Sequence, residues 1–436
     1  MNNAGLFKNN IKKILQKPLF GSEYILNGWA KQVRKQKTNL FFQLSDGSNL
    51  HGLSCLTKPT NQITNGCSML VKGNLQSHPT LGTPELLVNE FSILGNSDET
   101  YPIQKRRMTI DELRNSLVHF KPRTSIGLAY TKLNHHLTKS IHDAFAKLDF
   151  TQIYTPLITS MDCEGAGETF SLGSQLNCNA NLTVSGQLHL EIFANCMAKV
   201  YTFGSTFRAE KSHTNRHLAE FRMVEGEMAF LDDVGELMDY IEFIVRESVN
   251  DVFGKCSDEL KVLHEFNRAE SGLDHLMKNF HRISYKEAIK ILQKEYRDIE
   301  FGSDLSREHE LYLTNVHFNH SPVFVYNYPK SLKPFYMRQV DDDSSLVSCC
   351  DLLVPHVGEI VGGSLREERY SNLLANIHEK GMDPKKLDWY LDLRKYGTTR
   401  HGGFGLGYER LLQWISASQN IKDCVFFPRS NGHCPI

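Results

Sequence analysis

Residues Phe203–Phe230, FGSTFRAEKSHTNRHLAEFRMVEGEMAF, decide how the rest of the chain is interpreted. The second part of this stretch, Phe221–Phe230, alternates in period two, which predicts a strand with Phe221, Glu225 and Glu227 on one face. Two acids and an aromatic ring on one strand face are costly in an ordinary core, but they suit a ligand cleft that receives cationic and amide groups. The segment before this strand is polar and basic, as a hairpin loop closing over an anion would be.

The letters FRAE, RHLAEF and MAF resemble the second signature motif of class II aminoacyl-tRNA synthetases, in the form of the asparaginyl branch. The resemblance implies that Arg208 holds the ATP α-phosphate and the amino-acid carboxylate, that Glu210 contacts the adenine edge, and that Phe221 stacks on the ring. Arg216 and His217 then lie in the loop that covers the triphosphate. A charged surface hairpin is the alternative interpretation.

Length, charge and cysteine content limit the possible classes of protein. A chain of 436 residues holds two to three domains. Its net charge of -1 gives no general attraction to nucleic acid, although a local basic patch is enough for phosphate contacts. Ten scattered cysteines without a CxxC pair indicate reduced thiols rather than disulfides or a zinc site. No apolar run approaches the length of a membrane span.

The N-terminal segment is basic, and it contains no acid from Leu6 to Phe20. Its apolar residues Phe7, Ile11 and Ile14 fall on one helical face. This pattern fits either a mitochondrial transit peptide or a basic amphipathic helix of the mature protein.

Residues Tyr24–Gly95 read as five short strands broken by turns, with Asp46-Gly47 as a hairpin signal. This density of strands predicts a small closed barrel, and the OB-fold is the commonest such barrel that binds nucleic acid. Class IIb synthetases carry an anticodon-reading barrel at this position, and Gly28-Trp29 and FFQLSDGS resemble it.

The resemblance implies that Phe41 or Phe42 stacks on an anticodon base and that Glu85 reads another base. Barrel core is the alternative place for the two phenylalanines. Ser54 stands where the family has a glutamine, which indicates weaker or rearranged anticodon reading.

A polar, basic linker follows the barrel at Ser97–Pro122. Lys105, Arg106 and Arg107 within it either touch RNA phosphates or are simply solvated, and TIDE at 109–112 is a capping box that starts a short helix.

An amphipathic helix is predicted from Leu133 to Leu148, followed by a strand over Phe150–Pro156. A helix, a strand and a proline in this order resemble the first class II motif. That resemblance implies a homodimer interface built from the helix and the strand.

The stretch Asp162–Phe170 combines glycines with acids and suits a tight loop over an α-amino group. By resemblance, Glu164 holds the substrate ammonium and Gln187 bonds near its carboxylate. Aspartyl enzymes place a lysine three residues after this glutamine, where this chain has Leu190. An acid at Glu225 accepts from an amide NH2 and repels a carboxylate.

Arg366 is expected to donate to the side-chain oxygen that asparagine and aspartate share. Together with Leu190 and Glu225, this favours asparagine as the substrate.

The segment Asp351–Arg369 is predicted to form strand, proline turn and strand. Carboxylates suit Mg2+, with phosphate oxygens completing the shell. Glu359 is the expected metal and ATP ligand, Asp351 is a weaker candidate, and Gly362 offers only backbone where some relatives have serine. The three acids at 341–343 favour a solvated turn over a metal site.

The glycine-rich stretch Gly402–Arg410 opens a helix over Leu411–Ser418. A dinucleotide-binding turn is the alternative, but no βαβ unit surrounds it. It resembles the third class II motif, in which glycines let the backbone approach ATP and Arg410 binds the γ-phosphate.

The expected fold is α+β, with an N-terminal OB-fold barrel and a class II catalytic domain of antiparallel sheet flanked by helices. The expected boundaries are 1–20 for the basic segment, 21–97 for the barrel, 98–125 for the linker and 126–436 for the catalytic domain. The expected catalytic residues are Arg208 and Arg410. The expected ATP-binding residues are Arg208, Glu210, Arg216, His217, Leu218, Phe221, Glu359, Gly407, Glu409 and Arg410. The expected amino-acid-binding residues are Glu164, Ser185, Gln187, Arg208, Glu225 and Arg366.

By resemblance the chain is an asparagine-activating ligase with L-asparagine, ATP, Mg2+ and tRNA(Asn) as partners. It is expected to be a homodimer with no membrane association. Three alternatives remain open: an aspartyl enzyme, which charges one or both tRNAs; a non-catalytic RNA-binding relative; and a free-standing amide-forming synthetase. LREERY and the short tail after Arg429 resemble mitochondrial asparaginyl enzymes and favour the mitochondrial matrix over the cytoplasm.

Overall fold

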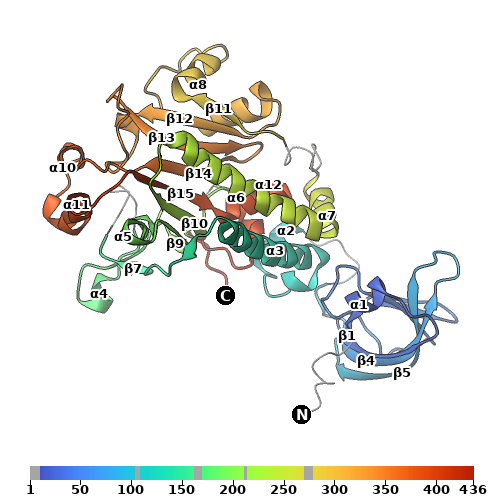
Figure 1. The fold of residues 1–436 in the computed structure, drawn as a ribbon. Coiled ribbons are helices and arrows are strands. Elements are labelled where there is room, and N and C mark those ends of the chain that lie inside the picture. Colours follow the sequence, from blue (N-terminus) through green and yellow to red (C-terminus); the bar gives the residue numbers. More distant parts are fainter. Residues whose placement is uncertain (1–9, 104–108, 162–168, 211–213, 270–277) are drawn as a thin grey trace. The chain divides into compact units, whose positions relative to one another are not determined.

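The computed structural model describes residues 10–103, 109–161, 169–210, 214–269 and 278–436. Two compact units divide the chain, one ending at Thr131 and the other beginning at Lys132. Each unit is described by itself (Figure 1). No helix among the described residues is long and apolar enough to cross a membrane.

The first unit contains the predicted closed barrel, whose strands follow the order β1-β2-β3-β5-β4. The strands alternate buried and exposed residues, and the buried set forms one core. Its strands are β1 Glu23–Lys35, β2 Leu40–Ser45, β3 Leu53–Thr57, β4 Ser68–Ser77 and β5 Pro84–Gly95. The OB-fold prediction is therefore confirmed.

Helix α1, Ile11–Gln16, packs into the same barrel core. Ile11 is completely buried and Ile14 is 3% exposed, and the backbone N–H of Ile11 donates to Asp46 Oδ2 at 2.9 Å. Removing these side chains would open the barrel core. Residues 11–16 of the basic segment thus form an amphipathic helix that packs into the barrel.

The predicted capping box at Thr109 also forms. The Thr109 hydroxyl accepts from the N–H of Glu112, and the Glu112 carboxylate accepts from the N–H of Thr109. It starts the short helix α2, Ile110–Asn115. Lys105, Arg106 and Arg107 lie outside the described residues.

The second unit is built on an eight-stranded sheet of order β11-β12-β13-β14-β15-β10-β9-β6. Neighbouring strands are antiparallel except for the pairs β11–β12 and β6–β9. Its strands are β6 Thr151–Gln152, β9 Lys199–Phe207, β10 Glu220–Ala229, β11 His281–Ser284, β12 Val323–Pro329, β13 Leu346–Val354, β14 Gly358–Leu365 and β15 His401–Gly407. Strands β7 Ile158–Thr159 and β8 Asn181–Leu182 form a separate pair.

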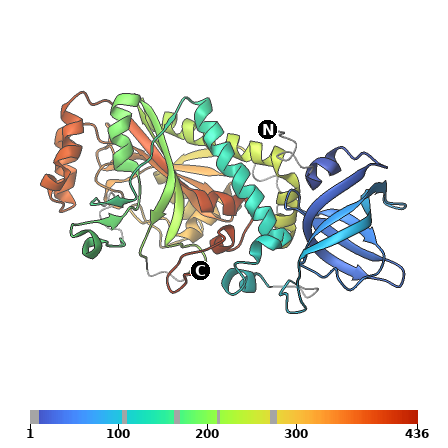
Figure 2. The ribbon, with the colours of Figure 1, turned by 90° about the horizontal axis from the view of Figure 1, so that it is seen from below.

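Helices cover the large sheet, and α6 lies across β13, β14 and β15 (Figures 1 and 2). Helix α5 packs on β9 and β10. The helices are α3 Ser125–Lys147, α4 Gly173–Leu176, α5 Gln187–Met197, α6 Val234–Lys255, α7 Ser257–Asn267, α8 Tyr285–Leu292, α9 Arg307–Leu311, α10 Tyr370–Glu379, α11 Asp388–Lys395 and α12 Tyr408–Ser416.

Two elements differ from the expected bounds. Helix α3 begins at Ser125, earlier than predicted, and the strand expected over Phe150–Pro156 is reduced to Thr151–Gln152.

Candidate active site

One cavity in the second unit brings together the residues expected to bind ATP. Lining it are Arg208, Glu210, Arg216, His217, Leu218, Phe221, Glu359, Gly407, Glu409 and Arg410. They come from the β9–β10 hairpin, from β14 and from the start of α12, elements that are far apart in sequence. The sheet order places β14, β15 and β10 side by side, and so brings these side chains to one place.

The hairpin that carries Arg208 is anchored on both sides. The Arg208 N–H donates to the carbonyl of Ala219 at 3.0 Å, which closes the base of the loop. Farther along, the Asn215 side-chain amide donates to the carbonyl of Gln419 at 3.1 Å, and the N–H of Ile421 donates to the carbonyl of Asn215 at 3.0 Å. The described part of the loop is therefore held against the C-terminal segment.

Basic groups crowd this cavity. Burial lowers the pKa of Arg216 below its usual value, and the nearby guanidiniums of Arg307 and Arg410 lower it further. Arg410 donates to the carbonyl of Glu359 at 2.8 Å, and its guanidinium lies 3.6 Å from the Glu359 carboxylate. Cations that depress one another's pKa favour a polyanion between them, because its charge relieves their repulsion.

Two predicted adenine contacts lie at the hairpin. The guanidinium carbon of Arg208 lies 5.5 Å from the centre of the Phe221 ring, and Arg208 and Glu210 approach to 4.0 Å. His217 Nε2 lies 3.7 Å from the Glu210 carboxylate, and burial lowers the pKa of this histidine while Glu210 opposes that shift.

Glu409 lines the cavity, but its carboxylate is engaged by the protein. It accepts from the backbone N–H and from Nε of Arg222, each at 2.9 Å, and only 3% of the residue is exposed. Arg222 in turn lies 4.0 Å from the centre of the Tyr408 ring and donates to Asn134 Oδ1 at 2.8 Å. The Glu409 carboxylate thus also supports β10, and its expected contact with ATP stays a prediction.

The residues expected to hold the amino acid lie beside this cavity on α5, β10 and β14. Glu225 accepts from the Ser185 hydroxyl and, at 2.8 Å, from the N–H of Gly186. Gln187 begins α5, and its Nε2 donates to Glu191 at 3.2 Å. Glu164 lies outside the described residues.

Arg366 makes a bidentate ion pair with Glu227, at 2.7 and 2.9 Å. Its third nitrogen donates to the Ser364 hydroxyl at 2.7 Å. Glu225 and Glu227 lie on one face of β10, as the alternation predicted, and both are buried. Leu190 is completely buried, in a small cluster with Ala194 and Val200.

The two carboxylates expected to hold Mg2+ flank Gly362. A Cβ atom at that glycine would lie 3.3 Å from Glu359 Oε1 and 3.6 Å from Asp351 Oδ1, so a serine there would enter the space between them. The other oxygen of Asp351 accepts from Lys333 Nζ at 2.7 Å. The two acids fit Mg2+, but only with phosphate oxygens added, since no group of three or more acid, histidine or cysteine side chains suited to a metal occurs in the described ranges.

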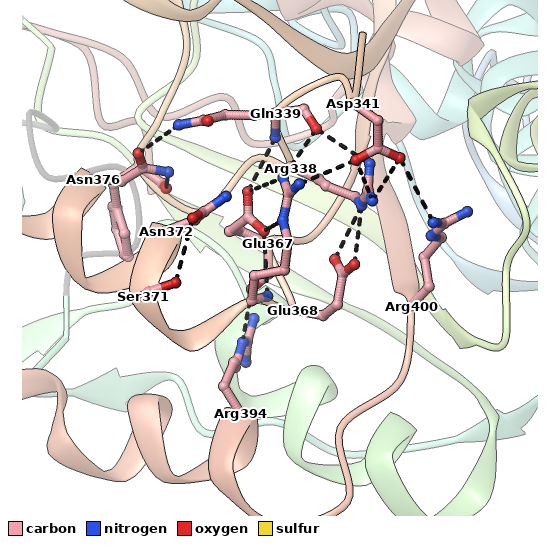
Figure 3. Close-up of polar contacts among 12 residues, drawn as sticks. Arg338, Gln339, Asp341, Glu367, Glu368, Ser371, Asn372, Asn376, Arg394 and Arg400 are labelled. Atoms are coloured by element: carbon pink, nitrogen blue, oxygen red, sulfur yellow. Dashed lines mark hydrogen bonds and ion pairs between the residues drawn. The ribbon is translucent and has the colours of Figure 1, made fainter. Parts of the chain in front are cut away.

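Asp341 belongs to an arginine cluster, in agreement with the interpretation of the acids at 341–343 as a surface turn (Figure 3). Its carboxylate accepts from Arg338 at 2.9 and 3.0 Å and from Arg369 at 3.1 Å, and Arg400 lies 3.9 Å away. More than half of the Asp341 side chain remains exposed.

The glycines of β15 serve two purposes. Gly405 and Gly407 line the ATP cavity. At Gly402 and Gly403 the need for a glycine comes from the sheet itself, because a Cβ at Gly403 would lie 1.7 Å from Glu227 Oε2, and one at Gly402 would lie 2.7 Å from the Ser364 carbonyl. This corrects the prediction that all these glycines make room for ATP.

In the barrel, Phe42 is 2% exposed and belongs to the core. It therefore cannot stack on an anticodon base while the barrel is closed, which corrects its assignment. Phe41 is only partly buried. Glu85 accepts from Gln76 Nε2 at 3.0 Å.

Three polar residues lie side by side on neighbouring strands, because Ser54 of β3 is paired with Glu85 on one side and with Gln43 on the other. They form a polar row across the barrel. Gln43 in this row and Gln76, which is paired with Glu85, are amides that sequence reasoning missed, next to the serine that replaces the family's glutamine.

Further lining residues of the ATP cavity were also missed. They are Met223, Ile360 and Ile421. Their side chains are apolar, so no chemical signal marks them in the sequence. Only the sheet order and the closing C-terminal segment reveal their position.

Comparisons with known proteins agree with this geometry. Residues 111–431 match the family described as tRNA synthetases class II (D, K and N). The chain is 41% identical to the probable mitochondrial asparagine–tRNA ligase of Dictyostelium discoideum, over 96% of this chain and 95% of that protein. It is also 41% identical to human asparaginyl-tRNA synthetase, over 95% of this chain and 91% of that protein.

Among solved structures, asparaginyl-tRNA synthetase from Pyrococcus horikoshii complexed with asparaginyl-adenylate has a TM-score of 0.90 and 31% identity, covering 98% of this chain and 99% of that chain. The chain therefore belongs to the class II tRNA synthetases of the D, K and N group. Within that group, its family is that of the asparagine–tRNA ligases.

Proposed function

We propose that this protein is an asparagine–tRNA ligase that activates asparagine with ATP and transfers it to the 3′ end of tRNA(Asn). The observation that carries the proposal is the convergence of Arg208 and Arg410 on one cavity, together with the buried Glu225 and Arg366 on the neighbouring strands. ATP is then a substrate, and the reaction needs no nucleophile from the protein.

In the first step, the asparagine carboxylate attacks the α-phosphate of ATP and pyrophosphate leaves. Arg208 binds the α-phosphate and the attacking carboxylate, and Arg410 binds the γ-phosphate. Arg216 and His217 cover the triphosphate, and Phe221 stacks on adenine. These fixed cations stabilise charge that builds up on the phosphates, and they position the reactants in line.

The fit of Glu359 and Asp351 around Gly362 supports a Mg2+ site. A bound Mg2+ supplies positive charge for the phosphate oxygens. Lys333 holds the Asp351 carboxylate from its other side, so that Oδ1 faces the glycine.

In the second step, a hydroxyl of the terminal tRNA ribose attacks the adenylate carbonyl and AMP leaves. The barrel binds the anticodon through the partly exposed Phe41 and Gln43. Glu85 is 2% exposed, so it supports this surface from below through its bond from Gln76. We assign residues 21–97 to this barrel domain, 98–125 to a linker and 126–436 to the catalytic domain. The basic residues of the linker contact RNA phosphates.

A homodimer is supported by exposed apolar side chains at the free edge of the large sheet. Tyr154, Leu157 and Ile158 follow the edge strand β6 and are 88%, 45% and 48% exposed. Exposed edges next to apolar patches favour pairing with another chain.

We also propose the mitochondrial matrix as the location. The support is the likeness to the Dictyostelium protein named mitochondrial. Because Ile11 and Ile14 fill the barrel core, any cleaved leader ends before α1.

The test is amino-acid-dependent ATP–pyrophosphate exchange with asparagine and aspartate run side by side. Wild type is expected to exchange with asparagine, and Arg208→Ala is expected to lose at least about 100-fold in exchange rate while retaining tRNA binding. Arg282→Ala is the matched control, since this partly exposed arginine pairs with Asp239 and Glu242 of α6 and is not among the residues that line the cavity. Exchange with aspartate would move the chain to the aspartyl branch, and near-normal exchange by Arg208→Ala would overturn the proposed site.

A further inference from the structure

A fully buried carboxylate lies behind the predicted asparagine pocket, at Glu191 of α5. One oxygen, Oε2, accepts from Arg394 at 2.7 Å and from the Tyr390 hydroxyl at 2.8 Å, and lies 3.2 Å from His401 Nε2. The other oxygen accepts from Gln187 at 3.2 Å. None of the Glu191 side chain is exposed.

This carboxylate touches two residues of the proposed amino-acid site. Gln187 precedes it by one helical turn on α5, so both side chains lie on the same helix face. Arg366 Nε lies 3.9 Å from the nearer oxygen of Glu191. Nε of Arg366 thus faces two acids, with Glu227 bound directly and Glu191 farther away.

Helix α11 supplies the partners of Glu191. Tyr390 and Arg394 are four residues apart and face the same side, and Arg394 donates to the Tyr390 oxygen at 2.9 Å. Arg394 Nε also donates to the carbonyl of Glu367 at 3.1 Å, and Figure 3 shows its guanidinium directed toward this segment. Since Glu367 follows Arg366 in the chain, α11 fixes both the carboxylate and the backbone next to the arginine.

The buried charges around this pocket can be counted. The carboxylates of Glu191, Glu225 and Glu227 are 0%, 4% and 1% exposed, and the guanidiniums of Arg366 and Arg394 are 3% and 4% exposed. Burial alone would raise the pKa of Glu191, but Arg394 and His401 hold it below its usual value, so this acid stays ionised. Each buried arginine already has a carboxylate partner, Glu227 for Arg366 and Glu191 for Arg394.

A neutral carboxamide adds no charge to this balance, whereas a substrate carboxylate adds one more negative charge to a buried site. Such a charge is expensive when no cation is left to pair with it.

We propose that Glu191 is a specificity-determining residue, which acts through Arg366 and Gln187 to make the pocket accept a side-chain carboxamide and reject a carboxylate. This inference rests on the proposed function. Glu191 itself does not touch the substrate; it positions Arg366 and neutralises its charge from behind, while Arg394 and Tyr390 hold Glu191 in place.

The experiment compares kcat/KM for asparagine and aspartate in pyrophosphate exchange by three variants. Glu191→Gln removes one negative charge and keeps the shape, and it is expected to raise the aspartate-to-asparagine ratio by about tenfold or more, with the KM for ATP unchanged. Arg394→Met removes a positive charge, so the ratio should fall or stay the same. Tyr390→Phe removes a hydrogen bond without changing any charge and should leave the ratio within about threefold of wild type.

A merely structural role predicts a different pattern, because all three variants would loosen the pocket and move the ratio in the same direction. That result, or an unchanged ratio in Glu191→Gln, would overturn the proposal. If Glu191→Gln does not fold, the double variant Glu191→Gln/Arg394→Met removes one charge of each sign and should keep the wild-type ratio. A wild type that does not exchange with asparagine would instead contradict the proposed function itself.

Discussion

The charge state of Glu310 depends on its burial and on charged residues of other elements. It comes from the short helix α9, and its carboxylate accepts from the N–H of Glu359 at 3.2 Å. Burial and the nearby Glu359 charge raise the pKa of Glu310 to about 7, although Arg410 and Arg216 oppose the shift. Near neutral pH this acid is therefore only partly ionised in the folded protein.

This shift predicts how stability depends on pH. Between the ordinary pKa near 4.5 and about 7, the folded state holds a proton on Glu310 that the unfolded state has lost. The contribution of Glu310 to the free energy of unfolding therefore falls as pH rises through this window. Glu310→Gln removes the effect, so the variant should melt at a higher temperature than wild type at pH 8 and at nearly the same temperature at pH 5.

The measurement is thermal unfolding of both proteins at the two pH values, without nucleotide or metal. Glu308→Gln is the matched control, since it alters an exposed acid of the same helix. An equal stabilisation by Glu310→Gln at pH 5 and pH 8 would show that packing, and not ionisation, is responsible.

The sequence predicted well which residues line the site. It predicted less well which partner each of these side chains contacts. The ATP-cavity residues were found from motif letters, and all the predicted ones line one cavity. The residue type of Glu409, by contrast, does not show that its carboxylate also binds Arg222. Glu191 drew no attention at all, because its partners Tyr390, Arg394 and His401 are about 200 positions away.

At the scale of elements, β15 shows why a glycine pattern has more than one cause. It pairs with β10 on one side and β14 on the other. Gly403 faces the Glu227 carboxylate, whereas a Cβ at Gly405 would meet Cε of Met223 at 2.5 Å, the flexible end of a side chain. Methionine can move aside, but Glu227 is fixed by its ion pair with Arg366.

Alanine substitution should therefore separate the two glycines. Gly403→Ala is expected to displace Glu227, destabilise the fold by about 1–3 kcal/mol and reduce asparagine-dependent exchange at least about 100-fold. Gly405→Ala should fold like wild type and lose less than about tenfold. Thermal unfolding and pyrophosphate exchange on both variants check this, and equal effects would contradict the packing argument.

Periodicity predicted elements best where one face is buried and one is exposed. The barrel strands and the long helix α3 have such patterns, and both were expected. The strand after α3 was predicted too long, because the apolar residues around Tyr154 that suggested a strand are exposed in the single chain. Contacts within one chain do not explain why these exposed residues are apolar.

At the scale of the whole molecule, the two faces of helix α5 have different roles. The inner face of α5 carries Gln187 and Glu191, which belong to the proposed amino-acid site. The outer face carries Ile192, Phe193 and Met197, which are 40%, 39% and 43% exposed. A partner subunit seated there would therefore fix the helix that positions the substrate.

We expect a homodimer, with a measured mass of twice the 49.8 kDa of one chain in light scattering after size exclusion. The double variant Tyr154→Asp/Leu157→Asp places charges in the exposed apolar segment and should yield monomers, because buried unpaired charges are strongly unfavourable at an interface. Tyr396→Asp is the matched control, since Tyr396 is 79% exposed but lies beyond the end of α11, and it should remain dimeric.

Activity links the dimer to the site. If the partner fixes α5, the monomeric variant should bind ATP normally but show a raised KM for asparagine, since Gln187 and Glu191 lose their external support while the hairpin with Arg208 keeps its own anchors. Loss of both substrates together would indicate general unfolding, which circular dichroism would reveal. A monomer with wild-type KM for asparagine would show that the network of Tyr390 and Arg394 alone is enough to hold the helix.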